Sequence, residues 1–540
     1  MSLRRNANVT GVAAIASLAL ILIFAASIVA AAQTAVTTYH NDTYRTGWNS
    51  TETTLTPANV TASQFGLLAT IAVDDQVDAQ PLGVPNVTST AGIHQGVHDV
   101  AYVVTGNNSV YAIDADAGTV LLNVNLGTPV SEPLGCNNNG PNVGITSTPV
   151  IDLGANNIYL IAYVQGSTGP AYYVHALDLG NLTDKITPQL VSASHTLSNG
   201  NTFNFNATYQ RQRPALLEAN GNIYAGFGSF CDFAANQSRG WLLGWDSATL
   251  EPLASNQLLN SLASDNGSFF LSSIWMSGYG LALDDSSNIV FVTGNSDYFG
   301  DTYTGTTNIQ ESTIKVASNL SEVVDLFTPS DFGTLDRGDT DFGSGGVMVL
   351  PDQTGTYPHL AVAAGKNGSM FLMNEVDLGG YSAKKNNVLG TYGIGGCWCG
   401  ESYYVDPKDG AARVVSSGGS QISTWKLETS PTTKLVISER SAGISTGQNG
   451  GFFTSVSSNG TASPIIWALS RPTSTTINLL AFNPESKMAQ LFNTSAGYWP
   501  NTGGDSNQVP TVANGKVYVA SYQKLQIFGL LAGKKASSKK

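Results

Sequence analysis

The chain has 540 residues, of which 42% are hydrophobic and 12% charged, with 57 glycines and 21 prolines. This composition excludes a disordered chain and a long helical bundle, and it is typical of a large β protein with many turns. The net charge is −13, and because several basic residues lie in the two tails, the body carries 19 basic against 38 acidic residues. An acidic body repels phosphate backbones, which argues against nucleic acid as a partner.

The N-terminal residues have the pattern of an export signal. Arg4 and Arg5 precede residues 11–32, which carry no charge and end in three alanines. This order of charged, apolar and small residues is typical of a secretory signal peptide, and the apolar run of about 22 residues could also span a bilayer if uncleaved. We therefore expect residues 1–32 to be a signal peptide or a membrane anchor. The body is expected to be secreted, periplasmic or at the cell surface, with membrane contact only through an uncleaved leader.

Four cysteines lie in the body: Cys136, Cys231, Cys397 and Cys399. They allow three pairings in an oxidising compartment, and the sequence does not choose between them. Their spacing lacks the second ligand pair of a zinc site. A basic tail over residues 531–540 follows the body.

A short strand pattern recurs eight times along the chain. The first apolar run of each repeat lies at residues 100–104, 158–163, 223–227, 289–293, 360–364, 412–416, 465–469 and 517–521. A second strand follows each run, at residues 110–114, 174–178, 241–246, 313–316, 370–374, 422–425, 479–483 and 525–528. Asp or Asn ends five of these second strands, as a turn favours.

The spacing of the repeat indicates propeller blades. Markers ahead of the first five strand pairs lie 68, 65, 66 and 66 residues apart, at Pro81, Pro149, Pro214, Gly280 and Gly346. Units of this size with four short strands are typical of a blade. The eighth unit lacks an outer strand, which residues 65–73 are expected to supply. The sequence thus predicts an all-β fold, an eight-bladed propeller of four-stranded antiparallel blades over residues 33–530. A stack of β-sandwiches, the alternative, would need linkers that the chain lacks.

This pattern resembles the pyrroloquinoline quinone (PQQ)-like propeller superfamily, which contains the quinoprotein alcohol dehydrogenases and non-catalytic relatives. The resemblance covers residues 39–530, and residues 41–47 (Asn-Asp-Thr-Tyr-Arg-Thr-Gly) also resemble the start of a secreted branch without a characterised reaction. Because a shared fold does not by itself supply a function, the site residues need separate comparison.

The resemblance implies cofactor and metal residues in blades three to five. Trp275 stands where the dehydrogenases place a tryptophan under the quinone, and Lys366 stands where they place a cation against the quinone oxygens. Asn295, in a Thr-Gly-Asn stretch, and Asp232 take the positions of calcium ligands. Turn chemistry at Asn295 and Lys366, and packing of Trp275 between blades, explain the same residues without a ligand.

The resemblance also implies a catalytic carboxylate. Residues 328–331 are similar to a Thr-Pro-x-Asp segment, after which the family places a second Asp as the base. Thr334 occupies that position here, so the role falls to Asp331 or Asp336. Asp339 and Asp341 follow with an Asp-x-Asp spacing that hints at a calcium loop, although solvation of an acidic loop explains all four carboxylates equally.

Strand parity predicts where these residues lie without reference to the family. In a four-stranded antiparallel blade, the loop between strands two and three and the connection to the next blade open on the same face. All the predicted site residues belong to these connections: Asp232, Trp275, Asn295, Asp331, Asp336 and Lys366. They are therefore expected to gather on one face, where carboxylates, an amide, a flat aromatic ring and a cation suit a hard metal ion and a planar ligand.

Three functions follow as hypotheses. The first is binding of a small-molecule ligand or a protein partner on the loop face, without turnover. The second is a calcium- and PQQ-dependent alcohol or sugar dehydrogenase, in which calcium polarises the quinone, a carboxylate takes the alcohol proton and hydride passes to the quinone. The third is a protein-assembly scaffold. The chain has neither the adjacent cysteines of many such dehydrogenases nor a Cys-x-x-Cys-His motif for haem, so any electrons need an external acceptor.

Overall fold

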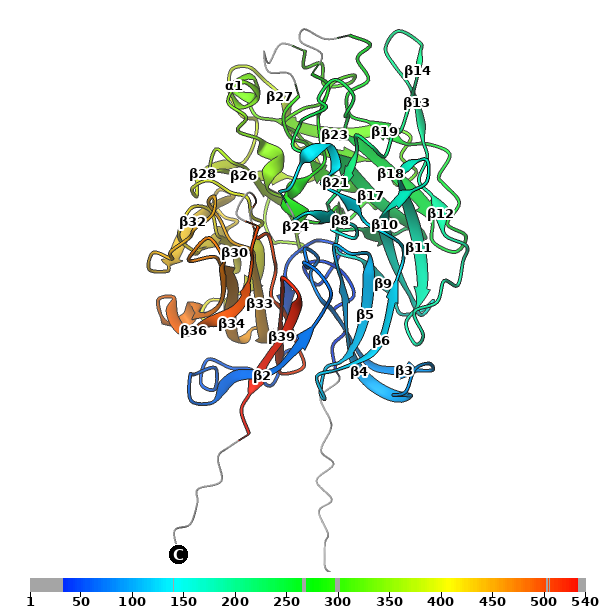
Figure 1. Ribbon diagram of the computed structural model, residues 1–540. Coiled ribbons are helices and arrows are strands. Elements are labelled where there is room, and N and C mark those ends of the chain that lie inside the picture. The colour runs from blue at the N-terminus through cyan, green and yellow to red at the C-terminus, as the bar shows by residue number, and fades with distance from the viewer. Residues whose placement is uncertain are drawn as a thin grey trace, which may run out of the picture. The chain divides into compact units, whose positions relative to one another are not determined.

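Eight sheets of mainly four antiparallel strands follow one another and form a β-propeller (Figure 1). The computed structural model describes residues 33–138, 140–264, 269–296, 302–501, 504 and 506–532. The predicted fold class is confirmed. The predicted leader and the basic residues of the predicted tail lie outside the described residues, and among those described no helix combines the length and the apolarity needed to cross a bilayer.

In the first four blades the strands lie side by side in chain order. Blade 1 contains β3 (Leu82–Ser89), β4 (Gly96–Val104), β5 (Ser109–Asp114) and β6 (Thr119–Asn125). Blade 2 contains β9 (Val150–Asp152), β10 (Asn157–Gly166), β11 (Gly169–Asp178) and β12 (Gln189–Leu190). Blade 3 contains β15 (Arg211–Gln212), β16 (Leu217–Ala219), β17 (Asn222–Gly228), β18 (Trp241–Asp246) and β19 (Gln257–Leu258). Blade 4 contains β20 (Ala282–Leu283), β21 (Ile289–Val292), β22 (Thr313–Val316) and β23 (Val323–Thr328), with β27 (Gly380–Tyr381) added in parallel.

The strands of blades 5 to 7 also follow chain order, whereas the outer strand of blade 8 comes from the N-terminal part of the chain. Blade 5 contains β24 (Val347–Leu350), β25 (Leu360–Ala364), β26 (Ser369–Asn374) and β28 (Gly390–Gly393). Blade 6 contains β29 (Ser402–Val405), β30 (Ala412–Ser416), β31 (Ser423–Glu428) and β32 (Lys434–Arg440). Blade 7 contains β33 (Thr454–Asn459), β34 (Ala462–Ser470), β35 (Thr476–Asn483) and β36 (Ala489–Tyr498), with β1 (Trp48–Asn49) added in parallel. Blade 8 contains β37 (Thr511–Ala513), β38 (Lys516–Ser521), β39 (Lys524–Leu530) and β2 (Phe65–Ala72).

Short elements occupy the connections. Two hairpins lie outside the blades, β7 (Val130–Ser131) with β8 (Asn142–Val143) and β13 (Ser194–Thr196) with β14 (Thr202–Asn204). The helices among the described residues are one α-helix, α1 (Phe332–Arg337), and the 3-10 turns η1 (Pro133–Gly135), η2 (Met276–Gly278), η3 (Phe342–Ser344) and η4 (Pro484–Ser486). α1 and η3 lie in the connection from blade 4 to blade 5, where the sequence predicts the catalytic carboxylate.

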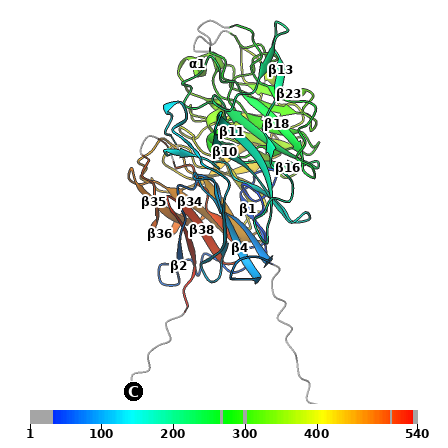
Figure 2. The same ribbon diagram turned by 45° about the vertical axis from the view of Figure 1, so that its right-hand side comes forward.

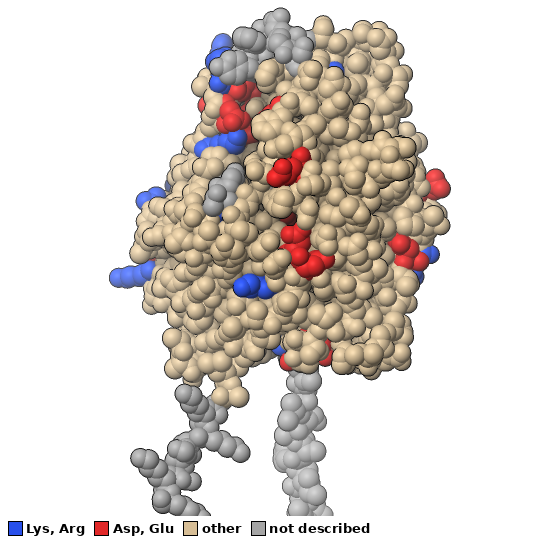
Figure 3. Space-filling view, in the orientation of Figure 1, with Lys and Arg blue, Asp and Glu red and all other residues tan. Residues whose placement is uncertain are grey.

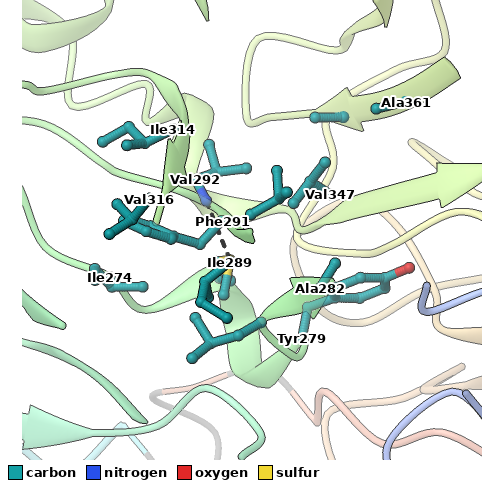
Figure 4. Close-up of a cluster of buried hydrophobic side chains, with 14 of the residues drawn as sticks. Ile274, Tyr279, Ala282, Ile289, Phe291, Val292, Ile314, Val316, Val347 and Ala361 are labelled. Carbon is teal, nitrogen blue, oxygen red and sulfur yellow. Dashed lines mark hydrogen bonds between the residues drawn. The ribbon is translucent and has the colours of Figure 1, made fainter. Parts of the chain in front are cut away.

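The inner strands are continuous apolar runs because neighbouring blades cover both faces of each sheet. All residues of β21 and β25 are buried. Figure 4 shows this packing, with Phe291 and Ile314 of blade 4 in the same cluster as Val347 and Ala361 of blade 5. Full burial of an aliphatic side chain contributes about 1.5–3 kcal/mol, so stacking of the blades is a main source of stability.

The ring closes through the strand that the sequence predicts. β2 pairs antiparallel with β39, from Phe65 opposite Leu530 to Ala72 opposite Lys524. The blue β2 lies beside the red C-terminal strands in both ribbon views (Figures 1 and 2). The Phe65 ring packs on Trp467 and Phe492 of blade 7, with centroids 5.6 and 5.0 Å away. Both ends of the propeller therefore share one sheet, which covers an edge that would otherwise be open.

The N-terminal segment (residues 34–52) makes hydrogen bonds to every blade. Its partners lie in or next to the first strand of each blade, and they are Gly83, Ile151, Leu216, Leu283, Val349, Tyr403, Val456 and Val512. Arg45 is fully buried within this segment. Its guanidinium donates to Leu281 O (2.7 Å) and Leu216 O (3.0 Å) as well as to acceptors of the segment itself. The segment thus ties the eight blades together around the centre of the ring.

The surface carries few charged side chains. Most of the described surface on the face drawn in Figure 3 is uncharged, in keeping with the 12% of charged residues in the sequence. Acidic side chains there lie in a few separate groups.

Candidate functional site

A cavity of 640 Å³ opens among the connections that strand parity places on one face. It is lined by two tryptophans (Trp275 and Trp398), three carboxylates (Asp232, Asp339 and Asp341) and four cations (Arg211, Arg213, Lys366 and Arg471). Three of the predicted site residues thus belong to one lining: Asp232, Trp275 and Lys366. The structure shows that they lie together, while their roles stay predictions.

Lys366 is in contact with the carboxylates of the cavity. Its Nζ lies 2.9 Å from Asp341 Oδ2 and 3.3 Å from Asp339 Oδ1, and it also donates to the Asp339 carbonyl oxygen at 3.1 Å. Burial alone would lower the pKa of Lys366, but the charges of Asp341 and Asp339 outweigh it and raise the pKa to about 12. Lys366 is therefore a permanent cation at neutral pH.

The four cysteines, whose pairing the sequence leaves open, form two disulfides. Cys136 is bonded to Cys231, and Cys397 is bonded to Cys399. Both bridges border the cavity, because Cys231 and Trp398 belong to its lining. The cavity wall is therefore cross-linked at two places.

Two tryptophans lie close to Lys366. The lysine Nζ is 5.5 Å from the ring centroid of Trp275 and 5.8 Å from that of Trp398, within the range of a cation–π interaction. Trp398 is the residue enclosed by the Cys397–Cys399 bridge, which restricts the backbone on both sides of it. The cavity thus presents two indole rings beside one cation.

Asp232 is held by its neighbours in the loop between β17 and β18. The Ser229 hydroxyl donates to its carboxylate, and the adjacent Cys231 is fixed by the disulfide to Cys136. Burial first, and then the charge of Asp341, raise the pKa of Asp232 to about 6. A carboxyl group with this pKa changes its charge near pH 6, well above the range of an ordinary aspartate.

A further carboxylate, Glu311, is fully buried next to Asp341. Glu311 Oε2 accepts a hydrogen bond from Phe342 N (2.6 Å), and Oε1 has no hydrogen-bond partner among the described residues. Burial, followed by the charges of Asp341 and Asp336, raises the pKa of Glu311 well above its usual range. The pKa of Asp341 is also raised by burial, although Lys366 opposes the shift. Such an acidic cluster either keeps protons or takes up a divalent cation.

Arginines supply the positive charge of the lining. Arg213 is buried, and its Nη1 donates to Thr146 O (2.9 Å), whereas its Nη2 has no hydrogen-bond partner among the described residues. Gly278 lies directly against this guanidinium, since a Cβ on Gly278 would fall 2.0 Å from Nη1. Burial lowers the pKa of Arg213 while the charge of Asp78 opposes the shift. A buried arginine with one unused donor at a cavity suits an anionic group of a ligand.

Asn295, the predicted calcium ligand, lies next to the carboxylates of the cavity. Its backbone N–H donates to Asp341 Oδ1 (3.2 Å), and its side-chain amide donates to Asp339 Oδ1 (3.3 Å). The side chain therefore orients Asp339 in this structure. A metal role for Asn295 remains a prediction, because it would require the amide oxygen to point toward the ion.

The two predicted catalytic carboxylates lie outside the lining of the cavity. Asp331 is exposed, and α1 begins at the next residue, Phe332. Asp336 is buried, and its carboxylate accepts hydrogen bonds from Ser296 N (3.0 Å) and Gln310 Nε2 (3.2 Å). Their catalytic role stays a prediction, and neither carboxylate belongs to the lining of the cavity.

Sequence reasoning assigned no site role to several residues of the lining. Trp398 lies between Cys397 and Cys399, and neither Trp398 nor Arg213 stands in a motif that predicts a ligand site. Asp339 and Asp341 did carry a signal, their Asp-x-Asp spacing. Membership of the cavity depends on how the loops fold, so spacing alone could not have distinguished these carboxylates from Asp331 and Asp336.

Substitution of Asp232 by asparagine is expected to stabilise the protein near neutral pH. The pKa of Asp232 is about 6 in the folded chain against an ordinary value of 3.8. As the pH rises from about 4 to 6, Asp232 therefore loses its proton readily in the unfolded chain but not in the folded chain, which favours unfolding. The wild type therefore loses stability across this window. Asparagine does not titrate, and Asp232→Asn should gain on the order of 2 kcal/mol at about pH 7 and nothing below about pH 4. Denaturant unfolding at both pH values measures the difference.

A surface carboxylate provides the control for this experiment. Asp377 is exposed, so Asp377→Asn should change the free energy of unfolding by less than about 0.5 kcal/mol at either pH. If Asp232→Asn changes the free energy of unfolding equally at about pH 7 and below about pH 4, burial does not raise the pKa of Asp232.

Comparisons with known proteins identify the fold. No protein-family model matches the chain, and no curated protein matches its sequence. The quinohemoprotein alcohol dehydrogenase from Comamonas testosteroni has a TM-score of 0.57 and 14% identity, covering 94% of this chain and 82% of that chain. A quinohemoprotein alcohol dehydrogenase from Pseudomonas putida has a TM-score of 0.58 and 12% identity, with the same coverage of 94% and 82%. A europium-containing methanol dehydrogenase has a TM-score of 0.58 and 10% identity, covering 92% and 98%. The chain therefore shares the β-propeller fold of these solved structures.

Proposed function

We propose that the chain is an exported ligand-binding propeller whose cavity takes a flat organic molecule with carboxylate groups, together with a divalent cation. One observation carries the proposal. Two tryptophans, a buried acidic cluster and an arginine with a donor unpaired among the described residues meet in one cavity of 640 Å³. This volume lies within the range of small-molecule sites.

Each kind of side chain in the lining supplies one contact. The indole rings of Trp275 and Trp398 offer flat apolar surfaces for stacking. Arg213 Nη2 can donate to a carboxylate of the ligand, in a charge-assisted hydrogen bond. A divalent cation beside Asp232 and Asp341 would let both carboxylates stay ionised despite their burial.

Two observations support export. All four cysteines are in disulfides, which persist mainly in oxidising compartments outside the cytosol. Residues 1–32 have the composition of a signal peptide or membrane anchor. A secreted, periplasmic or cell-surface location is therefore part of the proposal.

A second candidate function is that of a calcium- and PQQ-dependent alcohol or sugar dehydrogenase. The fold shared with quinohemoprotein alcohol dehydrogenases over 94% of the chain favours it. PQQ is flat and carries carboxylates, so it belongs to the proposed ligand class, and when bound it supplies the hydride acceptor. The residues present fit it: Trp275 for stacking, Arg213 for a carboxylate, Lys366 beside the quinone oxygens, and Asp232 with Asp341 for the cation.

If the chain is a dehydrogenase, the cavity offers a different residue as the catalytic base from the two that the sequence predicts. Asp339 lines the cavity, its side chain is 73% exposed, and Lys366 Nζ lies 3.3 Å from its Oδ1. An accessible carboxylate next to a fixed cation can accept a hydroxyl proton from a bound alcohol. We therefore propose Asp339, ahead of Asp331 and Asp336, as the base in this second function.

Titration of the full chain with PQQ, with and without Ca²⁺, tests both functions. Quenching of tryptophan fluorescence and retention in equilibrium dialysis should show one PQQ per chain, bound more tightly with Ca²⁺. Reduction of an electron-accepting dye on addition of alcohols or glucose then separates the dehydrogenase from a ligand-binding protein. If the chain retains neither PQQ nor other flat carboxylated rings at millimolar concentration, both proposals fail. The remaining hypothesis would then be the protein-assembly scaffold. It predicts a protein partner that the Asn295→Ala variant recovers as well as the wild type does.

A further inference from the structure

A second group of metal-ligating side chains lies apart from the cavity. Asp285, Asp352 and His359 each offer one ligand atom, and these atoms all lie within 4.8 Å of one another. His359 Nδ1 is 2.7 Å from Asp285 Oδ2 and 3.0 Å from Asp352 Oδ1. Asp285, which is 67 and 74 positions from Asp352 and His359 in sequence, is thus brought to them by the packing of blade 4 against blade 5.

This group lies on the face opposite to the cavity. Asp285 belongs to the connection between β20 and β21, and Asp352 and His359 belong to the connection between β24 and β25. Both are connections between the first and second strands of a blade. Connections between second and third strands, and between blades, form the cavity, and in an antiparallel blade they open on the other face. The two groups of residues are therefore independent.

Asp285 is oriented from the other side by the N-terminal segment. The Tyr44 hydroxyl donates to Asp285 Oδ1 at 2.5 Å, which leaves Oδ2 directed toward His359. Tyr44 is fixed in turn, because its carbonyl oxygen accepts from Val349 N in blade 5 (3.0 Å). Hydrogen bonds of this kind, made to the far oxygen of a carboxylate, commonly orient metal ligands.

The backbone of the group is anchored by buried ion pairs. Lys315 Nζ lies 2.9 Å from Asp284 Oδ2 and 2.6 Å from Glu375 Oε1, and all three side chains are nearly inaccessible to solvent. Asp284 precedes Asp285 in the turn, and Glu375 N donates to the His359 carbonyl oxygen (3.0 Å). The positions of Asp285 and His359 are therefore set by rigid neighbours.

His359 differs from the other histidines that contact carboxylates. His98 pairs with Asp114 and His175 pairs with Asp184, so each of these Nδ1 atoms has a single carboxylate partner. At His359, two carboxylate oxygens converge on one ring nitrogen. One N–H can point at only one of them, whereas a metal ion between the three atoms would bind all of them.

We propose that Asp285, Asp352 and His359 bind a divalent first-row transition-metal ion such as Zn²⁺. An imidazole nitrogen together with carboxylate oxygens selects this class, since Ca²⁺ and Mg²⁺ prefer sites made of oxygen atoms alone. The side chains of Asp285, Asp352 and His359 are 28%, 70% and 32% exposed, so water can complete the coordination. The ion would join blade 4 to blade 5 and, through Tyr44, to the N-terminal segment.

Metal binding to the full chain, freed of metal by a chelator, tests the site. Isothermal titration with Zn²⁺ and absorbance titration with Co²⁺ should show that the wild type binds one ion at this site. The His359→Ala variant should no longer bind this ion, and the Asp352→Asn variant should bind it much more weakly. Asp352 is the most exposed of the three ligands, so its variant is expected to fold normally. Tyr44→Phe keeps the ring but removes the hydrogen bond to Asp285, and it should weaken binding about 10- to 100-fold.

His98→Ala is the matched control, because it removes a histidine that also contacts a carboxylate. It should leave Zn²⁺ and Co²⁺ affinity unchanged. Ions bound by the carboxylates of the cavity would still bind to the His359→Ala variant. This remaining binding distinguishes them from an ion at His359. The proposal is overturned if the wild type binds neither ion below millimolar concentration, or if His359→Ala binds both as the wild type does.

Discussion

Replacement of Arg45 by alanine is expected to lower the free energy of unfolding by about 4 kcal/mol, because each buried acceptor left without a partner costs about 1–3 kcal/mol. The fully buried guanidinium donates to Leu281 O and Thr38 Oγ1 (both 2.7 Å), to Tyr39 O (2.8 Å) and to Leu216 O (3.0 Å). Alanine supplies none of these donors and leaves a space at the centre of the ring. Equilibrium unfolding in guanidinium chloride, followed by tryptophan fluorescence, measures the loss.

Two variants control this experiment. Arg440 is exposed at the end of β32, and Arg440→Ala should change the free energy of unfolding by less than about 0.5 kcal/mol. Arg45→Lys keeps the charge but loses the planar donors that reach several carbonyls at once, so it should recover only part of the loss. A loss below about 1 kcal/mol in Arg45→Ala would show that the N-terminal segment does not hold the blades together.

Replacement of Trp275 by alanine is expected to weaken binding of PQQ, the probe for the proposed ligand class, by about 100-fold. Stacking of a planar ring on an aromatic side chain contributes about 1–3 kcal/mol, and here the indole also lies 5.5 Å from the Lys366 ammonium. Without the indole, the ligand loses its stacking surface and Lys366 loses one neighbour. Equilibrium dialysis of PQQ against wild type and variant, with Ca²⁺ present, measures the change.

Trp48→Ala is the matched control for Trp275→Ala. Trp48 is partly buried, contacts Tyr403 in blade 6 and does not belong to the lining of the cavity. Its loss should affect stability but leave PQQ affinity unchanged. If Trp275→Ala binds PQQ as tightly as the wild type, the stacking role of Trp275 is wrong, even if the ligand class is right.

The blades could be predicted from sequence because of how a propeller is packed. Each inner strand is covered on both faces, so it appears as an apolar run that turn residues interrupt at regular intervals. The missing outer strand of the eighth unit predicted the pairing of residues 65–73 with the C-terminal strand, which the structure confirms. The bonds from residues 34–52 to all eight blades had no such signal, because they are made by backbone groups and the side chains of Arg45 and Asn49, without periodicity.

Strand parity predicted one face for the site residues, and the structure brings Trp275, Lys366 and Asp232 together in one cavity. Parity could not predict the conformation of the connection between blades 4 and 5. There Asp331 precedes α1 and Asp336 lies within it, and neither belongs to the lining of the cavity, whereas Asp341 beyond the helix lies 2.9 Å from Lys366 Nζ. Of two carboxylates five residues apart, Asp336 and Asp341, only Asp341 belongs to the lining of the cavity.

The sequence by itself determined the number of blades, the strand that closes the ring and the face on which the loops gather, since these depend on local periodicity and on the direction of each strand. Tertiary structure alone decided the pairing of the cysteines, the Arg213 donor that is unpaired among the described residues and the meeting of Asp285, Asp352 and His359. These depend on side chains that are distant in sequence and are positioned by irregular loops. Their distances follow from the packing of one blade against the next, for which a linear pattern carries no signal.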